Sequence, residues 1–596
     1  MSPRAHLLPL ATLTLLALLL YWPCLNGAFV YDDPNAVSQS QLIRHLSPTL
    51  FLTLSTRPLT DYTFAINYAI AGLDPWPYHL TNMLLHALNG LLVYAIAWQT
   101  LALPVLVQRY GMARLGIAWV AAALFIAHPL ATETVAYVSS RSEVLAATFI
   151  LLSLLCFILA TTTDDPRRRR LYTYALPACG FAGLASKETA LMIAPALFVY
   201  DWLFLMPSRW RRPRGRLYTL ALLPAATGGL LLFLKAMLSP SPMGEYKATA
   251  GLGFDRFTPW EYLLTQFGVI AHYLRLIVLP IGQTFDYDWP LARDPLTPNV
   301  ILPFALLAGL IVVAWRAARR QPLFTFALFW TLLILLPTSS VVPIADLAVE
   351  RRMYLPIAAI ALLAAAWLWD LARWVAARQQ VQPLAAYVAV VVAPLAVLAA
   401  LTFARAQLWG DAIALHEDGV AKAPFNPRVR LNLGVTYLNL QQQQRAYETL
   451  LEAKRLYDLQ QSMQAFPRIG AFIQYNLGAV LFARTEIDRA EVELKRSLDL
   501  GGQYLALRPM ALMLLSRIAA ARSDWQTATA ELTEALKYQD NPDWRVDLAE
   551  MQRQSGDVAA ARTTLQRALK TYPGNQRATA LLAKINAKPA AAQAAP

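Results

Sequence analysis

The chain carries two adjacent carboxylates, Asp32 and Asp33, in the segment 29–36, soon after its first apolar run at residues 7–22. Neighbouring carboxylates repel each other, so the pair needs cations or hydrogen bonds around it. One of the two is suited to act as a general base, at a depth where a substrate carried by a lipid can be reached. Asp-Pro is also a turn sequence, and the local pattern alone fits a loop better. Asp32 is the preferred base, but the sequence does not fix which side chain faces inward.

Other residues that could do chemistry stand at the ends of later apolar runs. These charged, histidine and tyrosine side chains are Arg57, His79, His128, Glu133, Arg141, Glu143, Lys187, Glu188, Glu350, Arg351, Arg352 and Tyr354. An ionisable group in a membrane segment costs about 2.5–3.5 kcal/mol, so a gathering on one side predicts a polar cavity. Taken singly, each also fits a structural role, as an ion pair at a helix end or a side chain reaching the interface. His86, deeper on the helix of His79, is expected to be structural.

The elements that must position these residues are membrane helices. Of the 596 residues 57% are hydrophobic and the mean hydropathy is +0.39, which is too apolar for a string of soluble domains. Apolar runs near the ~20 residues needed to cross ~30 Å of hydrocarbon lie at 7–22, 80–107, 115–131, 143–163, 172–186, 189–206, 217–238, 260–280, 299–315, 323–343, 354–372 and 383–404. The run at 7–22 has no small-residue cleavage site after it, so we expect a retained first helix.

The charges between these runs predict the orientation. Basic loops stay in the cytoplasm, and an inside N-terminus places the basic loops 109–114, 164–171 and 207–216 there. The run at 260–280 contains Gln266, His272 and Arg275, so we expect it to be re-entrant or interfacial. About eleven full spans and an external C-terminal part follow from this arrangement. A count of about twelve would move that part to the cytoplasm.

Beyond residue 404 the sequence changes to amphipathic, Ala- and Gln-rich helices that contain a repeat. Small residues recur at three matching positions of four units, namely Gly434, Gly478, Ser516 and Ala549, then Ala446, Ala490, Ala528 and Ala561, then Ala453, Ser497, Ala535 and Ala568. Small residues there allow the helices of one hairpin, and the next hairpin, to approach closely. The pattern predicts tetratricopeptide repeats over 405–588. The Ala- and Pro-rich tail 589–596 is expected to be disordered.

Several function classes find no support in the sequence. The three cysteines, Cys24, Cys156 and Cys179, form neither a disulfide framework nor a metal-ligand spacing. The chain has no Walker loop, dinucleotide fingerprint, zinc-protease motif or nucleophile elbow. The net charge of +14 lies largely in membrane loops, so nucleic-acid binding is not expected.

Several segments resemble those of the eukaryotic transmembrane and tetratricopeptide-repeat-containing O-mannosyltransferases. They are the Asp32–Asp33 loop and residues 57–60, 78–86, 128–133, 141–143, 186–188 and 350–356. The order of parts, a membrane domain followed by repeats, is also similar, and the resemblance covers nearly the whole chain. That family belongs to the GT-C class, which takes sugars from polyprenyl phosphates on the outer or lumenal face. The shorter repeat array and the abundant Arg, Ala and Pro indicate a bacterial relative.

The resemblance implies an all-α fold in two domains. Residues 1–404 would form a polytopic GT-C-type membrane helix bundle with outward loops 23–79, 128–142 and 239–298, and residues 405–588 a repeat solenoid. The protein would be an inverting glycosyltransferase of the bacterial cytoplasmic membrane. It would move a hexose such as mannose from a polyprenyl-phosphate donor to Ser/Thr hydroxyls of extracytoplasmic proteins, which the repeats would bind.

In that reaction Asp32 or Asp33 would deprotonate the acceptor, and one carboxylate suffices because a leaving phosphate needs little acid help. The donors suited to the phosphate are Arg351, Arg352, Lys187 and Arg141. GT-C enzymes with monophosphate donors generally use no metal. We therefore expect no cofactor, and a divalent metal on Asp32 and Asp33 is the less favoured alternative.

Two other function classes remain open. A transporter of lipid-linked sugars would be expected to show inverted repeats and polar residues at mid-membrane, and the sequence shows no such symmetry. A membrane-anchored repeat scaffold for envelope assembly would need only one or two spans. If neither aspartate is the base, Glu133 or Glu143 is the next candidate.

Overall fold

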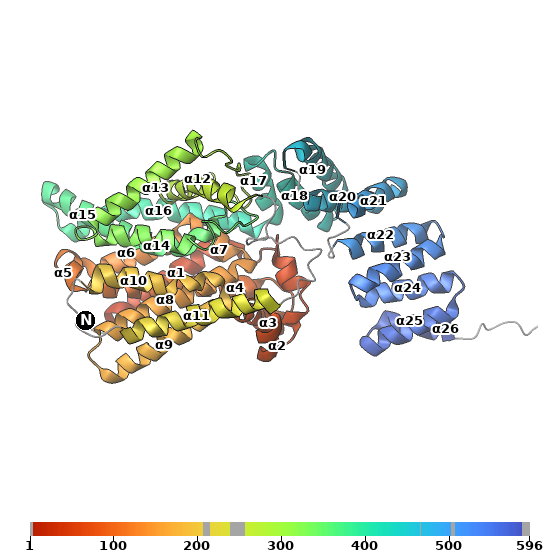
Figure 1. The fold of residues 1–596 in the computed structure, drawn as a ribbon, viewed down its shortest axis with the longest axis horizontal. Helices are drawn as coiled ribbons and strands as arrows, with labels where there is room; N and C mark the ends of the chain where they lie inside the picture. Colours follow the sequence, from red (N-terminus) through yellow and green to blue (C-terminus); the bar gives the residue numbers. More distant parts are fainter. Residues whose placement is uncertain (1–3, 207–214, 239–256, 465–466, 502–506, 587–596) are drawn as a thin grey trace, which may run out of the picture. The chain divides into compact units, whose positions relative to one another are not determined.

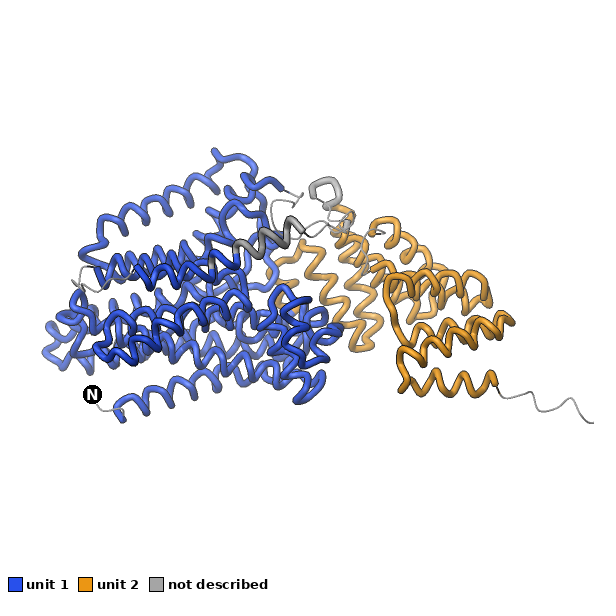
Figure 2. The backbone as a smooth tube through the Cα atoms, turned by 60° about the horizontal axis from the view of Figure 1, so that its bottom comes forward, with its two compact units in different colours: residues 1–240, 247–415 blue, residues 241–246, 416–596 orange. Residues whose placement is uncertain are grey.

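The computed structural model describes residues 4–206, 215–238, 257–464, 467–501 and 507–586. Parts of the predicted loops 207–216 and 239–298, and the predicted disordered tail, lie outside these residues. The chain divides into two compact units, one ending at Leu415 and the other beginning at His416 (Figure 2). The sequence prediction placed the boundary at 404/405, but the last membrane helix continues to Gly410.

The first unit is a bundle of helices, and each predicted apolar run contains at least part of an α-helix (Figure 1). Its α-helices are α1 (Arg4–Tyr21), α2 (Pro48–Leu54), α3 (Pro58–Ala71), α4 (Trp76–Thr100), α5 (Pro104–Tyr110), α6 (Arg114–Ala127), α7 (Thr132–Ala136), α8 (Arg141–Thr162), α9 (Pro166–Ser186), α10 (Ile193–Tyr200), α11 (Gly215–Leu238), α12 (Pro259–Val278), α13 (Pro298–Ala317), α14 (Pro322–Leu335), α15 (Tyr354–Gln379) and α16 (Pro383–Gly410). Many begin with proline in the first turn, where its missing N–H costs no hydrogen bond.

Helix α6 lies at the centre of this bundle and packs on α4, α15 and α1. Half of its buried residues are alanines with no exposed surface, so neighbouring helices come close. On α4 the matching position is Gly90, where an added Cβ would lie 2.5 Å from Cδ1 of Ile126. The core is therefore built from small side chains that fit around larger ones.

Eight segments of the described chain are long and apolar enough to cross a membrane, so the first unit is a multi-pass membrane domain. They are Arg4–Cys24, Trp76–Thr100, Pro104–Ala127, Val138–Thr162, Glu188–Leu205, Pro298–Ala317, Glu350–Gln379 and Pro383–Gly410. Helix α12, which the sequence predicts to be re-entrant or interfacial, is not one of the eight. The predicted count of about eleven spans stays a prediction.

The end of α16 crosses the chain just after α1 at two glycines. An added Cβ on Gly27 would lie 2.7 Å from the carbonyl oxygen of Trp409, and one on Gly410 would collide with the carbonyl of Pro23. Only glycine permits so close an approach of two backbones. This crossing brings the segment that leads to Asp32 against the last turn of α16.

The second unit is a series of helical hairpins, seen as the orange tubes in Figure 2. Helix α17 (Ala412–Lys422) begins before the unit boundary, and the helices after it are α18 (Pro427–Asn439), α19 (Gln443–Gln464), α20 (Pro467–Ala483), α21 (Ile487–Gly501), α22 (Arg508–Ala521), α23 (Trp525–Tyr538), α24 (Pro542–Gln554), α25 (Val558–Thr571) and α26 (Gln576–Asn586).

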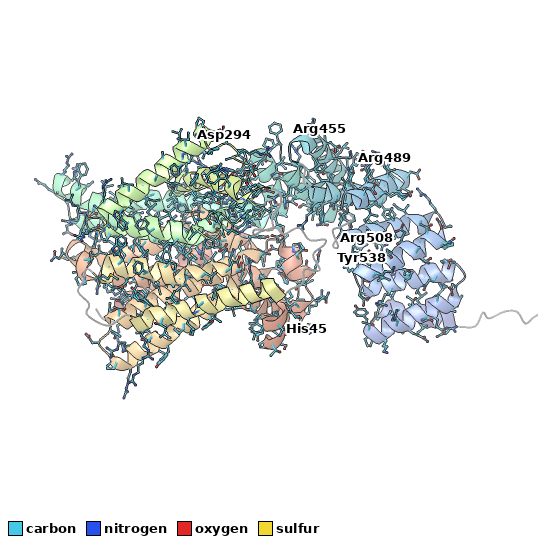
Figure 3. The ribbon with its side chains drawn as sticks, in the orientation of Figure 1. His45, Asp294, Arg455, Arg489, Arg508 and Tyr538 are labelled. Carbon is cyan, nitrogen blue, oxygen red and sulfur yellow. The ribbon has the colours of Figure 1, made fainter. Side chains whose placement is uncertain are left out.

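All twelve small residues of the predicted repeat are buried, which explains their pattern. An added Cβ would lie 2.6 Å from Cγ of Leu450 at Gly434, and 2.7 Å from Cγ of Leu494 at Gly478. Long side chains tie the hairpins on the outside, as where Arg508 of α22 lies over the ring of Tyr538 of α23 at 5.3 Å (Figure 3). The predicted fold class, an all-α membrane bundle followed by a tetratricopeptide-repeat solenoid, is confirmed.

Candidate active site

Asp33 is the buried member of the carboxylate pair. Its Oδ1 accepts hydrogen bonds from the backbone N (2.7 Å) and Oγ (2.5 Å) of Ser139, and its Oδ2 accepts one from the backbone N of Val30 (3.1 Å). Burial raises the pKa of Asp33 to about 7, although these hydrogen bonds oppose the shift. In this arrangement Asp33 fixes the loop to the turn at Ser139.

Asp32 has the opposite environment. Its side chain is exposed, and within the described residues its carboxylate makes no hydrogen bond or ion pair. Its backbone N donates to the hydroxyl of Tyr137 at 3.0 Å, which holds the residue in place. The preceding Tyr31 has a φ of +55°, a left-handed conformation that is uncommon for so large a side chain and concentrates at functional sites.

The predicted residues Glu133 and Arg351 form an ion pair. Nη1 of Arg351 lies 2.7 Å from Oε1 of Glu133, whose side chain has no exposed surface. Oε2 of Glu133 accepts hydrogen bonds from the backbone N of Glu350 (3.1 Å) and of Arg351 (3.3 Å). Glu133 thus binds the start of the 3₁₀ turn Glu350–Met353 and turns Arg351 toward α7. The Arg351 side chain keeps 20% of its surface exposed.

Glu350 is held by three residues that the sequence prediction missed. Its Oε2 accepts hydrogen bonds from Nε2 of Gln283 (2.7 Å) and Nη2 of Arg405 (2.9 Å), and its Oε1 accepts one from the hydroxyl of Tyr287 (2.7 Å). Arg405 comes from the end of α16, and Gln283 and Tyr287 from the segment after α12. The alternation of aromatic and acidic residues over 285–289 was the available signal, but the prediction treated this segment only as a loop.

Arg352 and Tyr354 belong to the frame around this turn. Arg352 donates from Nη1 to the carbonyl of Leu347 (3.1 Å) and from Nη2 to the carbonyl of Asp346 (2.7 Å). The hydroxyl of Tyr354 is hydrogen-bonded to Nδ1 of His86 at 2.8 Å. His86 is completely buried, and its structural role stays a prediction.

Lys187 and Glu143 pair with each other at the border of a small cavity. The cavity, of about 20 Å³, is lined among others by Glu143, Arg351, Arg352 and Tyr354. Its volume suits about one water molecule. Four predicted site residues from α8, the 3₁₀ turn and α15 are therefore brought to one place. Arg57 and Glu188, which also lie among the predicted site residues, form an ion pair at 3.1 Å, and both side chains are partly exposed.

Arg141 is completely buried, and its guanidinium donates hydrogen bonds to uncharged groups. It donates to the side-chain oxygens of Asn82 (2.8 Å), Asn67 (2.5 Å) and Thr63 (3.3 Å) and to the carbonyl of Tyr78 (2.7 Å). Its guanidinium also lies over the ring of Phe64 at 4.5 Å. These contacts tie α3, α4 and α8 together, and phosphate binding by Arg141 stays a prediction.

The two predicted cavity histidines are buried and bonded to the backbone. Nε2 of His79 lies 3.0 Å from the carbonyl oxygen of Gly27, and Nε2 of His128 lies 3.0 Å from that of Ile277. Nδ1 of His128 accepts a hydrogen bond from the backbone N of Leu130 at 3.2 Å. Both side chains hold loops against helices at this end of the bundle.

An aromatic cluster, formed by Tyr31, Tyr137, Phe285 and Trp409, contacts both the backbone of Asp32 and the side chain of Arg351. Phe285 stacks on Tyr31 with ring centroids 3.7 Å apart, and meets Tyr137 and Trp409 edge-on at 5.2 and 5.5 Å. The guanidinium of Arg351 lies 6.0 Å from the ring of Phe285. Burial raises the pKa of Tyr137 well above its usual value; the charges of Asp32 and Asp33 add to this, and Arg351 opposes it.

This arrangement combines a carboxylate that could act as a general base with an arginine that could bind an anionic group of a substrate. The exposed Asp32 donates from its backbone N to Tyr137 of the aromatic cluster, and the partly exposed Arg351 lies over Phe285 of the same cluster. The described residues hold no cluster of three or more His, Cys, Asp or Glu side chains that could bind a metal ion. The expectation of a metal-independent site stays a prediction.

Fold and site together define a multi-pass helical membrane protein with a C-terminal repeat solenoid. The tetratricopeptide-repeat family matches residues 519–585. Protein O-mannosyl-transferase TMTC2 of Mus musculus is 27% identical over 340 residues, which cover 52% of this chain and 39% of that protein. Protein O-mannosyl-transferase F38B6.6 of Caenorhabditis elegans is 24% identical over 444 residues, 70% of this chain and 58% of the relative. The chain is thus a relative of the repeat-containing O-mannosyltransferases, as the sequence motifs predict.

The chain spans less than two thirds of the length of these two relatives. Among solved structures, ArnT from Cupriavidus metallidurans bound to undecaprenyl phosphate is similar, with a TM-score of 0.34 and 15% identity over 70% of this chain and 79% of that one.

Proposed function

We propose that this protein is an integral-membrane glycosyltransferase of the GT-C class. It transfers a hexose, with mannose as the first candidate, from a polyprenyl phosphate to Ser or Thr hydroxyls of extracytoplasmic proteins. The relatives to which it is similar in sequence are named O-mannosyltransferases, which supports this class of reaction. The membrane domain and the solenoid fit a lipid-borne donor and a polypeptide acceptor.

The observation that carries the proposal is the state of Asp32. Six acids were predicted in the site, and five of them are engaged within the described residues: Asp33 by Ser139, Glu133 by Arg351, Glu143 by Lys187, Glu188 by Arg57 and Glu350 by Arg405. Asp32 is exposed and its carboxylate has no such partner in the described chain. A general base must be able to reach the proton it takes. Asp32 therefore fits the base, and Glu133 and Glu143 fit it poorly.

The reaction follows from these positions. The carboxylate of Asp32 accepts the proton of the acceptor hydroxyl, whose oxygen forms a bond to the anomeric carbon. The bond from that carbon to the phosphate oxygen breaks, and the lipid phosphate leaves with the electron pair. The guanidinium of Arg351 stabilises the charge that develops on the phosphate. Attack opposite to the leaving group gives inversion at the anomeric carbon.

Glu133 and Glu350 prepare Arg351 for this task. Glu133 neutralises part of its charge and fixes its side chain, while the Gln283–Tyr287–Arg405 contacts hold the turn on which it sits. A site held in place before the reaction loses no energy in reorganisation. Lys187 and Arg57 are each paired with a carboxylate, so they would bind an anionic donor only by exchanging Glu143 or Glu188 for its phosphate.

The test is transfer by the purified protein from a polyprenyl-phosphate mannose to a Ser/Thr-containing protein or short peptide, followed by mass spectrometry. We expect a hexose-sized addition to both. Deleting 428–596 should abolish transfer to the protein while part of the transfer to the peptide remains, because the repeats would bind the acceptor. Absence of transfer by the intact protein from any polyprenyl-phosphate hexose would contradict the proposal and return the scaffold and transporter classes to consideration.

A further inference from the structure

The segment 283–287 contacts both sides of the candidate site. Gln283 and Tyr287 hydrogen-bond the carboxylate of Glu350, whose neighbour is Arg351. Phe285, between them in sequence, stacks on Tyr31, whose neighbour is Asp32. One short stretch of chain thus joins the exposed carboxylate to the turn that carries the arginine.

We propose that Phe285 is a positioning residue that sets the place of Asp32 relative to Arg351. The inference rests on the proposed function, since it assigns Phe285 to the same reaction. Phe285 itself touches neither reacting group of that reaction. It acts through Tyr31 on one side and through Arg351 on the other.

The contacts of Phe285 account for this role. Its ring lies 3.7 Å from that of Tyr31 with an angle of 17° between planes, while Tyr137 and Trp409 close its sides. Aromatic pairs stabilise a contact beyond the area they bury, and a guanidinium over a ring adds attraction. These contacts therefore restrict the position of the Phe285 ring and of the side chains that pack on it.

The backbone at Tyr31 shows why such support is needed. Its left-handed φ of +55° is unfavourable for a side chain with a Cβ, and surrounding contacts must maintain it. The stacking on Phe285 and the hydrogen bond from the Asp32 backbone N to Tyr137 supply these contacts. Without the ring at position 285, the loop is free to relax, and the carboxylate of Asp32 moves with it.

The first arm of the test measures kcat and the KM for the donor. Phe285→Leu keeps an apolar side chain but removes the stacking, and displacement of a catalytic group by about 1 Å costs up to about 100-fold in rate. We expect the kcat of Phe285→Leu to fall by about 10- to 100-fold, with its donor KM within about twofold of the wild-type value. Phe285→Tyr, which keeps an aromatic ring, should retain most of the wild-type kcat. The matched control is Phe324→Leu, which removes a ring stacked on Trp367 elsewhere in the same domain and should leave kcat unchanged.

A second arm measures thermal unfolding in detergent for Tyr31→Leu, Phe285→Leu and the double variant. If the two rings stabilise each other, the double variant loses less melting temperature than the sum of the two single losses. Suppose that the wild type is active and that Phe285→Leu keeps the wild-type kcat, with or without a raised KM for the donor. That result would overturn the positioning role and leave the proposed function intact. If the intact protein transfers no sugar, the proposed function fails and the positioning role falls with it. Additive melting losses would reject the contact itself.

Discussion

Asp33 lies without solvent exposure among three hydrogen-bond donors, while Asp32 next to it is exposed. This difference assigns different tasks to two chemically identical side chains. Asp33 anchors the loop to Ser139, and Asp32 is left to meet a substrate. Replacing Asp33 therefore tests the stability of the loop, and replacing Asp32 tests the proposed catalysis.

The raised pKa of Asp33 predicts a pH-dependent stability. Its folded value of about 7 lies above an ordinary value near 4. The folded state then binds more protons between these values, so the stability due to this group is full below about pH 4 and is lost as the pH rises through about 7. Asp33→Asn removes this titration. We expect its melting temperature to fall further below that of the wild type at about pH 5 than at about pH 8. Equal gaps at both values would contradict the buried, raised-pKa state.

Arg351 is tested better by lysine than by alanine. Arg351→Ala would leave the buried carboxylate of Glu133 without its cation, which commonly costs 3–5 kcal/mol and confuses folding with function. Arg351→Lys keeps the charge but loses the planar fork that matches a phosphate. We expect at least about a tenfold loss of kcat/KM for the lipid donor with normal membrane insertion.

The control for that variant is Arg109→Lys. Arg109 contacts the carboxylate of Asp370 through two guanidinium nitrogens, at 2.7 and 3.1 Å. Asp370 lies on α15 sixteen residues beyond Tyr354, about 24 Å along the helix. The Arg109→Lys variant should keep the wild-type kcat/KM for the lipid donor. If both lysine variants transfer sugar at the wild-type rate, Arg351 is only a structural cation.

At the scale of elements, the candidate site is formed where the ends of several helices pack against one another. The loop after α1, the turn before α15 and the end of α16 are joined through Phe285, Glu350 and Arg405. The glycine crossing between residues 23–27 and the end of α16 sets how closely these ends approach.

Gly410→Ala should therefore loosen the site from a distance. The added Cβ would collide with a backbone carbonyl that cannot rotate away, and overpacking of this kind costs about 1–3 kcal/mol. We expect a lower melting temperature and reduced transfer. Gly116→Ala on α6 is the matched control, because its Cβ would have 3.8 Å to the nearest atom and should be tolerated. Identical behaviour of the two variants would show that the crossing does not constrain the site.

Periodicity made most of these elements predictable. The apolar runs predict the helices, and the twelve small residues predict the solenoid because all of them are buried where helices pack closely. The partners of Glu350 were not predictable in the same way. Gln283, Tyr287 and Arg405 come from distant segments, and their meeting depends on how α12 and α16 pack, which no local pattern encodes. The distinction between Asp32 and Asp33 likewise depends on Ser139, more than a hundred residues further along the chain.

At the scale of the whole molecule, the proposal requires the active face and the solenoid on the same side of the membrane. The basic loops predict that side to be extracytoplasmic. An alkaline phosphatase fused after Pro596 should be active, and a reporter that works only in the cytoplasm should be silent. The reverse pattern would mean that α12 crosses the membrane, and it would separate the repeats from their proposed acceptors.

The most direct test of the central claim compares Asp32→Asn with Asp33→Asn in the donor-to-peptide transfer assay. Asparagine keeps the size and polarity of Asp32 but cannot take the proton, so kcat should fall by about 10²–10⁴. The donor KM and the melting temperature of Asp32→Asn should stay close to those of the wild type, whereas Asp33→Asn should lose melting temperature as well. Transfer by Asp32→Asn at the wild-type rate would contradict the account, since no acid of the site would then remain in a position to act as its base.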